Sequence, residues 1–388
     1  MKIQLVSEVY PPRAGGAGWS SRALALGLRR AGHSVSVLTT SPGPPDLDGL
    51  PVTRLTVRGR KRLAIPRAFA ACLHDTARTG TLLHAQHSLS ALGTLAGDHA
   101  SRVAVTVRDH WPVCFWSTRI SRGALCPGCG LAAMTRCVEG HVRLPWALSW
   151  GALPYMQADL WAKRRALRRA GAVLAVSDAV AEELRTAGLS PETLPNIVDA
   201  EDTRVRAQAP PSWPLPERYL LFIGKLEDNK GARLLVPAVA AARTQLPLVV
   251  LGEGALAHTI RFDATALGVD LHQRGWADRD DVLRVMARAQ ALVFPSLWPE
   301  PLSRVLLEAL ALGTPVAAMA TGGTREILED GVSGLLATDA AGLSAALARL
   351  VDDVKLQRRI SEGARARAEA FSPETLIPRY EDIYRRLL

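Results

Sequence analysis

The chain has 388 residues, of which 48% are hydrophobic and 22% are charged, and its formal net charge is +10. This length predicts two or three domains, each large enough for its own core. The apolar residues are dispersed, and no run of about 18 of them could cross a bilayer. The composition therefore excludes an integral membrane protein with a spanning helix.

The N-terminus and the cysteine count indicate the compartment. The first residues, MKIQLVS, alternate like a strand and lack the apolar core of a signal peptide. Five cysteines, an odd number, fit a reducing environment better than a disulfide framework. We expect a cytoplasmic protein.

The positive charge is concentrated in the first half of the chain. Residues 1–200 carry 24 Lys and Arg against 13 Asp and Glu, whereas residues 201–388 carry 23 against 24. This asymmetry predicts an anionic partner for the first half, such as a membrane surface, an acidic acceptor or nucleic acid.

Short apolar runs alternate with helical patterns throughout the first half. The alternation is typical of α/β domains with parallel, doubly wound sheets. A helix is predicted over 19–30 and ends at Gly32. The runs that predict strands are 3–7, 34–40, 52–57, 81–87, 102–107 and 172–177.

A glycine-rich loop, VYPPRAGGAGWSS, follows the first strand. Gly15 and Gly16 would let the backbone approach a ligand closely, and a helix from about Gly18 would present its N-terminus. The alternative is a tight strand-to-helix turn without a ligand.

Three polar residues, Arg108, Asp109 and His110, directly follow the strand predicted over 102–107. Among them, His110 carries the side chain whose ordinary pKa lies closest to neutral pH. The alternative is that His110 packs against Trp111.

A long insertion, 111–170, contains four of the five cysteines. Cys126 and Cys129 enclose a short turn, Cys-Pro-Gly-Cys, and Cys114 and Cys137 lie on either side of it. Four thiolates could hold a tetrahedral structural zinc ion. A redox pair or simply buried thiols are the alternatives.

The end of the insertion combines aromatic and basic residues. Aromatic rings favour the headgroup level of a bilayer, and cations bind anionic lipid. Residues 146–169 therefore predict a helix lying on an anionic membrane surface; the alternative is a buried Trp-rich helix followed by a solvated basic face. The residues concerned are Trp146, Trp150, Tyr155, Trp161, Lys163, Arg164, Arg165, Arg168 and Arg169.

A proline-rich stretch, APPSWPLPER, leads into the second half. A predicted strand over 219–223 is followed by Gly224 and Lys225, and then by Lys230 and Gly231. Cations in a loop after a strand can pair with a diphosphate. Two solvated loop lysines are the alternative.

The stretch PSLWPEPLSRVLLEALALGTPVAA, residues 295–318, is the most informative part of the sequence. It follows an apolar strand and places Glu300 in a loop, Leu302, Ser303 and Arg304 at a helix N-terminus, and Glu308 on the second turn. The helix N-terminus favours a phosphate and the carboxylates can accept sugar hydroxyls, so the pattern predicts a nucleotide sugar. The alternative is an i,i+4 surface ion pair and a solvated loop carboxylate.

The Glu-x7-Glu spacing, the following Gly-Thr-Pro-Val and the later Gly322-Gly323-x-x-Glu326 resemble the retaining glycosyltransferases of family 4. The resemblance implies the GT-B fold, two Rossmann-like domains that face a central cleft. It divides the chain into an acceptor domain (1–200), a linker (201–217), a donor domain (218–370) and a helix (371–388) that crosses back to the first domain.

The resemblance also implies the chemistry. A hexosyltransferase would move a sugar from a nucleotide-diphosphate sugar to a sugar or lipid-linked sugar acceptor in glycan, polysaccharide or glycolipid biosynthesis. Glu300 would hold the donor sugar, Lys225 and Lys230 the diphosphate, and Glu308 the ribose. No cofactor would be required for catalysis, since there is no Asp-x-Asp metal motif.

Three positions depart from the family pattern. Arg108 stands where the family usually has a catalytic histidine, Lys225 where it has arginine, and Ser303 where it has glycine. The family's His-Asp pattern implies Asp109 and His110 as candidate catalytic groups: either His110 takes the place of the missing histidine or the enzyme manages without one. The departure at Arg108 leaves a second hypothesis, a non-catalytic subunit that binds the nucleotide sugar. No nucleic-acid recognition motif accompanies the basic first half, so nucleic acid is not expected as the partner.

Overall fold

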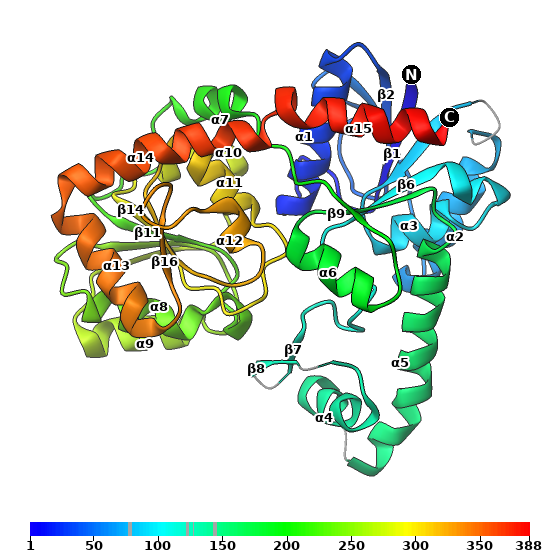
Figure 1. The fold of residues 1–388 in the computed structure, drawn as a ribbon. Helices are drawn as coiled ribbons and strands as arrows, with labels where there is room; N and C mark the ends of the chain where they lie inside the picture. The colour runs from blue at the N-terminus through cyan, green and yellow to red at the C-terminus, as the bar shows by residue number, and fades with distance from the viewer. Residues whose placement is uncertain (77–79, 122–123, 127, 143–145) are drawn as a thin grey trace. The chain divides into compact units, whose positions relative to one another are not determined.

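The computed structural model describes residues 1–76, 80–121, 124–126, 128–142 and 146–388. These form two compact units, each with its own sheet (Figure 1). Unit 1 comprises Met1–Ile197 and Pro373–Leu388, and unit 2 comprises Val198–Ser372. The segment predicted as a linker, 201–217, begins within a helix, α7 (Ala200–Ala207).

Unit 1 contains an eight-stranded sheet with the order β10-β9-β6-β5-β1-β2-β4-β3. Every pairing is parallel except that of β3 with β4. Its apolar strands are buried, as expected for a parallel sheet covered on both faces. The strands are β1 (Lys2–Ser7), β2 (Ser34–Thr39), β3 (Asp46–Leu47), β4 (Leu50–Arg54), β5 (Leu82–Ala85), β6 (Val103–Val107), β9 (Ala172–Ala175) and β10 (Glu192–Thr193).

The helices of unit 1 connect these strands. Helix α1 (Gly16–Arg30) begins three residues before the predicted start, because Gly15 serves as its N-cap with extended backbone. The others are α2 (Lys61–Thr76), α3 (Ser88–Thr94), α4 (Leu131–Val142), α5 (Trp146–Leu167), α6 (Asp178–Thr186) and α15 (Pro373–Leu387), with a short turn η1 (Asp98–Arg102).

The last helix, α15, completes the core of unit 1 (Figure 1). It packs against α1, and its buried side chains include Leu376, Tyr380 and Tyr384. The Tyr384 hydroxyl bonds Nδ1 of buried His84 on β5 at 2.7 Å, and Nε2 of His84 bonds the Thr106 hydroxyl at 2.7 Å. The predicted return of the C-terminal helix to the N-terminal part is therefore confirmed.

Within unit 1, α4 and α5 pack on each other around a small separate core. Phe115, Met134, Leu153 and Met156 belong to this core, and a two-stranded ribbon, β7 (Ile120–Ser121) with β8 (Ala124–Leu125), lies in the same insertion. No helix in the described part of the chain has the length and apolarity to traverse a bilayer.

Unit 2 contains a six-stranded parallel sheet with the order β13-β12-β11-β14-β15-β16. Counted in chain order, this is 3-2-1-4-5-6, the doubly wound order of dinucleotide-binding sheets. The strands are β11 (Leu220–Ile223), β12 (Leu248–Leu251), β13 (Leu271–Arg274), β14 (Ala291–Phe294), β15 (Val316–Met319) and β16 (Leu335–Ala337).

Helices cover this second sheet, and buried Leu, Val and Ala side chains fill the space between. Besides α7 they are α8 (Ala232–Ala241), α9 (Ala257–Leu267), α10 (Arg279–Arg288), α11 (Arg304–Leu312), α12 (Thr324–Ile327), α13 (Ala340–Asp352) and α14 (Val354–Ala368). Two short turns, η2 (Asp228–Lys230) and η3 (Glu369–Phe371), complete the unit.

Candidate functional site

The strand order of unit 2 defines one point where the connections reverse direction, between β11 and β14. These strands pair in parallel, so the loops that follow them leave from the same edge of the sheet. In doubly wound sheets, ligands bind outside the carboxyl ends of the strands at this point. The loop after β11 carries Lys225 and Lys230, and the loop after β14 carries Glu300.

Lys230 and Glu300 form an ion pair there. The Lys230 Nζ atom lies 2.7 Å from Oε1 of Glu300, whose side chain is buried. The Ser296 hydroxyl also donates to Oε1, at 2.6 Å, and the Lys230 ammonium lies 4.2 Å from the centre of the Trp298 ring. The carboxylate is therefore fixed by two donors, and the ammonium keeps further N–H donors for another partner.

Glycines bring the backbones around this pair into contact. Gly231 has φ +68°, and a Cβ on it would lie 1.8 Å from the Pro295 carbonyl oxygen. Gly323 donates its N–H to the Glu300 carbonyl at 2.7 Å, and a Cβ on it would lie 2.3 Å from the Pro301 carbonyl oxygen. Larger residues at either position would displace the loop that holds Glu300.

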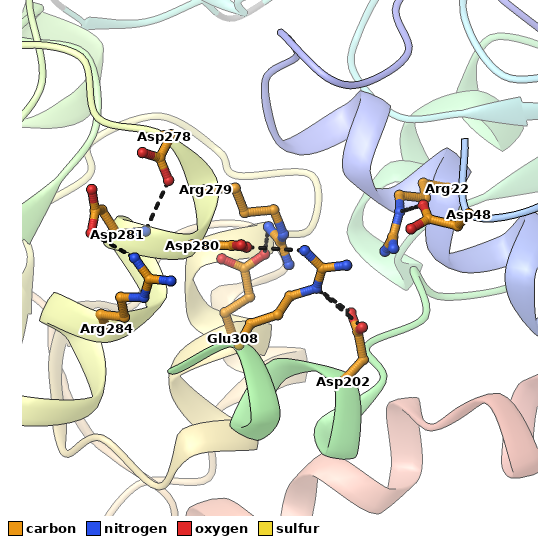
Figure 2. Close-up of polar contacts among 10 residues, drawn as sticks. Arg22, Asp48, Asp202, Asp278, Arg279, Asp280, Asp281, Arg284 and Glu308 are labelled. Carbon is orange, nitrogen blue, oxygen red and sulfur yellow. Dashed lines mark hydrogen bonds and ion pairs between the residues drawn. The ribbon is translucent and has the colours of Figure 1, made fainter. Parts of the chain in front are cut away.

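Glu308 lies on α11, and two arginines bind its buried carboxylate. Arg304 donates from Nε to Oε1 at 2.6 Å, and Arg279, the first residue of α10, pairs with the same oxygen (Figure 2). Burial alone would raise the pKa of Glu308, but Arg279 and then Arg304 hold that pKa below its ordinary value. The carboxylate is therefore ionised at neutral pH.

The remaining predicted residues of unit 2 differ in their exposure to solvent. The Lys225 side chain is 74% exposed, and its nearest acid is Glu227 at 3.9 Å. Gly224, with φ +157°, joins this loop to β11. Ser303 is the N-cap of α11 but makes no side-chain capping bond, and Leu302 precedes it as a buried residue.

The glycine loop of unit 1 leads directly into a helix N-terminus. Gly15 caps α1, nothing lies within 4 Å of where a Gly15 Cβ would be, and the first turn of α1 has no acidic residue. By contrast, the N-terminus of α3 is occupied, because Glu8 accepts from the N–H groups of Leu89 and Ser90 at 3.1 and 2.9 Å.

Arg108 points into the interior of unit 1. Its guanidinium donates to the side-chain oxygens of Asn196 and Gln86, and the residue is buried. Burial lowers the pKa of Arg108 to about 10, which still leaves it charged at neutral pH. Arg108 therefore ties β6 to the segments after β5 and β10.

His110 and Asp109 follow on the same loop. His110 is 2% exposed, and its Nδ1 bonds Oε2 of Glu183 on α6 at 2.6 Å. Burial is the largest cause that raises the pKa of Asp109 to about 6, although its Oδ1 accepts from the Trp111 N–H at 2.8 Å.

The four cysteines of the insertion line one cavity of about 10 Å³. Cys114, Cys126 and Cys137 are buried and Cys129 is partly buried, all as free thiols. The described residues nevertheless include no group of three or more His, Cys, Asp or Glu side chains that could hold a metal ion. The zinc prediction therefore gains no support from the structure; Pro127, within the Cys-Pro-Gly-Cys turn, lies outside the described residues.

Two family models match consecutive parts of the chain. "Glycosyltransferase Family 4" matches residues 14–202, and "Glycosyl transferases group 1" matches residues 205–367. The chain belongs to glycosyltransferase family 4. It is a retaining enzyme of the hexosyltransferase class that transfers a sugar from a nucleotide sugar to an acceptor in glycan or polysaccharide biosynthesis. Enzymes of this family typically need no cofactor.

Two curated relatives of this glycosyltransferase align over nearly their whole lengths. Glycogen synthase of Mycobacterium tuberculosis is 28% identical over 383 residues, which is 95% of this chain and 90% of that protein. Alpha-maltose-1-phosphate synthase of the same organism is 27% identical over 389 residues, covering 90% of this chain and 98% of that one.

Solved structures show the same GT-B fold. HepE from Anabaena in complex with UDP superposes with a TM-score of 0.71 and 20% identity, covering 98% of this chain and 99% of that one. Sucrose-phosphate synthase from Thermosynechococcus elongatus gives a TM-score of 0.73 and 21% identity, covering 100% and 99%. The fold prediction is therefore confirmed.

The structure also brings in residues that the sequence analysis did not select. Ser296 and Trp298 contact the Lys230–Glu300 pair, and Arg279 contacts Glu308. Ser296 and Trp298 lie within the predicted loop and could have been examined there. Arg279 has no such signal, since it lies 29 residues before Glu308 and meets it only through the packing of α10 on α11.

Proposed function

We propose that the donor binds at the edge of the unit 2 sheet, with Glu300 and Lys230 at the reacting end. The observation that carries this proposal is the ion pair of Lys230 with the buried Glu300 at the reversal point of the sheet. Glu300 has an orientation fixed by Lys230 and Ser296, as a group that positions donor-sugar hydroxyls requires.

The diphosphate is the leaving group of the reaction, so negative charge develops on it in the transition state. Lys230, Lys225 and the N-terminus of α11 at Leu302, Ser303 and Arg304 would stabilise that charge. Gly224 would let the β11 loop approach the phosphates, and Glu308 would accept the ribose hydroxyls. Protein cations would then serve where other transferases use a metal ion.

The acceptor would bind to unit 1. Gly15 and Gly16 offer the open N-terminus of α1, and Asp109 and His110 follow the carboxyl end of β6. Because His110 is buried against Glu183, we assign it the positioning of the Asp109 loop. Front-face attack in a retaining reaction lets the leaving phosphate take the acceptor proton, so a free histidine base is not required.

A thermal-shift screen of the full chain against UDP-, GDP-, ADP- and dTDP-sugars tests donor binding. The HepE structures were solved with UDP and with UDP-glucose, so UDP-glucose is the first candidate. A ligand present at 100 times its Kd stabilises the native state by about 2.7 kcal/mol. Glu300→Gln should then lower kcat more than donor affinity; no stabilisation by any nucleotide sugar would contradict the proposal.

The acceptor is proposed to be a sugar or lipid-linked sugar, with unit 1 resting on an anionic membrane through α5. Trp150 and Trp161 are 51% and 60% exposed and lie eleven residues apart, on one face of the helix. Arg165 is exposed and stacks over the Trp161 ring, with 5.4 Å from Cζ to the ring centroid. Tryptophan beside arginine suits the boundary of an anionic bilayer.

Not every basic residue of 146–169 supports this membrane surface. Lys163 pairs with Asp159 at 2.6 Å, Arg164 donates to the Pro112 carbonyl, and Arg169 donates to the Gly97 carbonyl. The side chain of Trp146 lies outside the described residues. The proposal therefore narrows to the face formed by Trp150, Trp161 and Arg165.

Co-sedimentation with liposomes tests this face. The wild-type chain should bind vesicles that contain anionic lipid, release them as salt rises, and bind less with Trp150→Ser and Trp161→Ser together. Trp276→Ser is the matched control, because Trp276 is 62% exposed but lies in unit 2. Equal binding to neutral and anionic vesicles, or none, would indicate an acceptor in solution.

Structural zinc in the insertion stays a hypothesis that rests on the four cysteines of the sequence, Cys114, Cys126, Cys129 and Cys137. Zinc analysis of protein purified without a polyhistidine tag tests it. One equivalent of zinc, lost when Cys126 and Cys129 are replaced by Ser, would support the hypothesis. Substoichiometric zinc would leave the thiols as packing groups.

A further inference from the structure

Arg279 contacts Glu308 from a different helix. It is the first residue of α10, directly after the N-cap Asp278, whose carboxylate accepts from the Asp281 N–H at 3.0 Å. Figure 2 shows its side chain directed at the Glu308 carboxylate. Both side chains are nearly excluded from solvent, with 9% exposed for Arg279 and 3% for Glu308.

The two arginines that bind Glu308 use one of its oxygens. Arg279 and Arg304 both donate to Oε1, and the structure records no contact of Oε2 within the described residues. A carboxylate has about four acceptor positions on its two oxygens, so Oε2 keeps its acceptor capacity for a ligand. Two cations against one carboxylate also leave a net positive charge beside the N-terminus of α11.

We propose that Arg279 is a positioning residue for the donor: it holds Glu308 so that Oε2 meets the ribose hydroxyls of the nucleotide. This inference rests on the proposed role of Glu308. Arg304 alone would leave the carboxylate free to rotate about one contact, whereas two donors from α10 and α11 fix its plane.

A neighbouring arginine offers the matched control. Arg206 pairs with Asp202 at 3.1 Å and with Asp280 at 3.0 Å, and so joins α7 to α10 without an ion pair to Glu308. If arginines in this cluster serve only to join helices, Arg206→Gln and Arg279→Gln should behave alike. If Arg279 orients Glu308, only Arg279→Gln should change recognition of the ribose.

The test is a calorimetric comparison of ribose and deoxyribose ligands with the full chain. The nucleoside diphosphate that binds the wild type is compared with its 2′-deoxy and 3′-deoxy forms. Wild type and Arg206→Gln should prefer the ribose form by roughly ten- to a hundredfold, the size of a charge-assisted hydrogen bond. Arg279→Gln should reduce that ratio at least fivefold, toward the ratio of Glu308→Gln.

The outcomes separate this inference from the proposed function. If no nucleoside diphosphate binds the wild type, the proposed donor site is wrong. If the wild type discriminates and Arg279→Gln keeps the same ratio, the site stands and the role of Arg279 is overturned. Should Arg279→Gln fail to fold, Arg279→Lys replaces it: the shorter point charge should still reduce the ratio severalfold, and an unchanged ratio overturns the inference.

Discussion

The two sheets of this glycosyltransferase differ in how the acidic side chains at their carboxyl edges are paired. In unit 2, Glu300 and Glu308 are buried with cations beside them, and arginines hold the pKa of Glu308 below its ordinary value. In unit 1, burial raises the pKa of Asp109 to about 6, and the Glu8 carboxylate accepts hydrogen bonds from the N-terminus of α3.

This difference separates what each edge can bind. A preorganised charge stabilises a transition state only where charge develops, and in the proposed function that charge develops on the donor diphosphate at the edge of unit 2. The edge of unit 2 accordingly contains ion pairs of Glu300 and Glu308, whereas hydrogen bonds of Arg108 and His110 hold the edge of unit 1. An edge of the second kind suits an acceptor that remains uncharged at its reacting hydroxyl.

The largest expected effect comes from removing a cation of unit 2. Lys230→Met should lower kcat by roughly a hundredfold. It removes the cation that is proposed to face the leaving group, and it leaves the buried Glu300 carboxylate without its cationic partner. Lys225→Met should cost about tenfold or less, because water already solvates that exposed ammonium. Steady-state kinetics on folded variants would check both; equal losses would remove the distinction between the two lysines.

The residues of the unit 2 edge could be selected from the sequence because they lie in loops that directly follow strands. Lys230 and Glu300 are 70 residues apart, yet the strand order brings β11 beside β14 and so brings the two loops together. Spacing along one helix likewise predicted that Arg304 faces Glu308.

Packing between elements that are distant in the sequence was not predictable in this way. Nothing local in the sequence pairs Arg279 with Glu308, or Arg108 with Gln86 and Asn196, since these contacts depend on how elements pack in three dimensions. The same holds for His110, which the sequence offered as a catalytic group and the structure buries against Glu183.

A smaller effect is expected in the neutral core of unit 1. Tyr384→Phe leaves Nδ1 of the buried His84 without its partner, and His84 cannot respond by ionising because burial lowers its pKa to about 3. We expect about 1–3 kcal/mol of lost stability and a Tm lower by several degrees. Calorimetry would measure this, with Tyr155→Phe on the exposed face of α5 as control. An unchanged Tm would mean that α15 is held by apolar packing alone.

The last effect should distinguish the two edges by its dependence on pH. The folded pKa of Asp109 is about 6, above its ordinary value of 3.8, so the folded chain binds more protons than the unfolded chain between these values. Stability contributed by the protonated form is therefore lost as pH rises from about 4 to 6.

Asp109→Asn keeps an oxygen that can accept from the Trp111 N–H but carries no charge. The stability difference between variant and wild type, followed as the Tm difference, should grow across that window by up to about 3 kcal/mol and stay constant above pH 7. Glu308→Gln should show no such gain at neutral pH, because its arginines favour the charged form. A Tm difference for Asp109→Asn that does not vary with pH would show that the unit 1 edge tolerates charge as the unit 2 edge does.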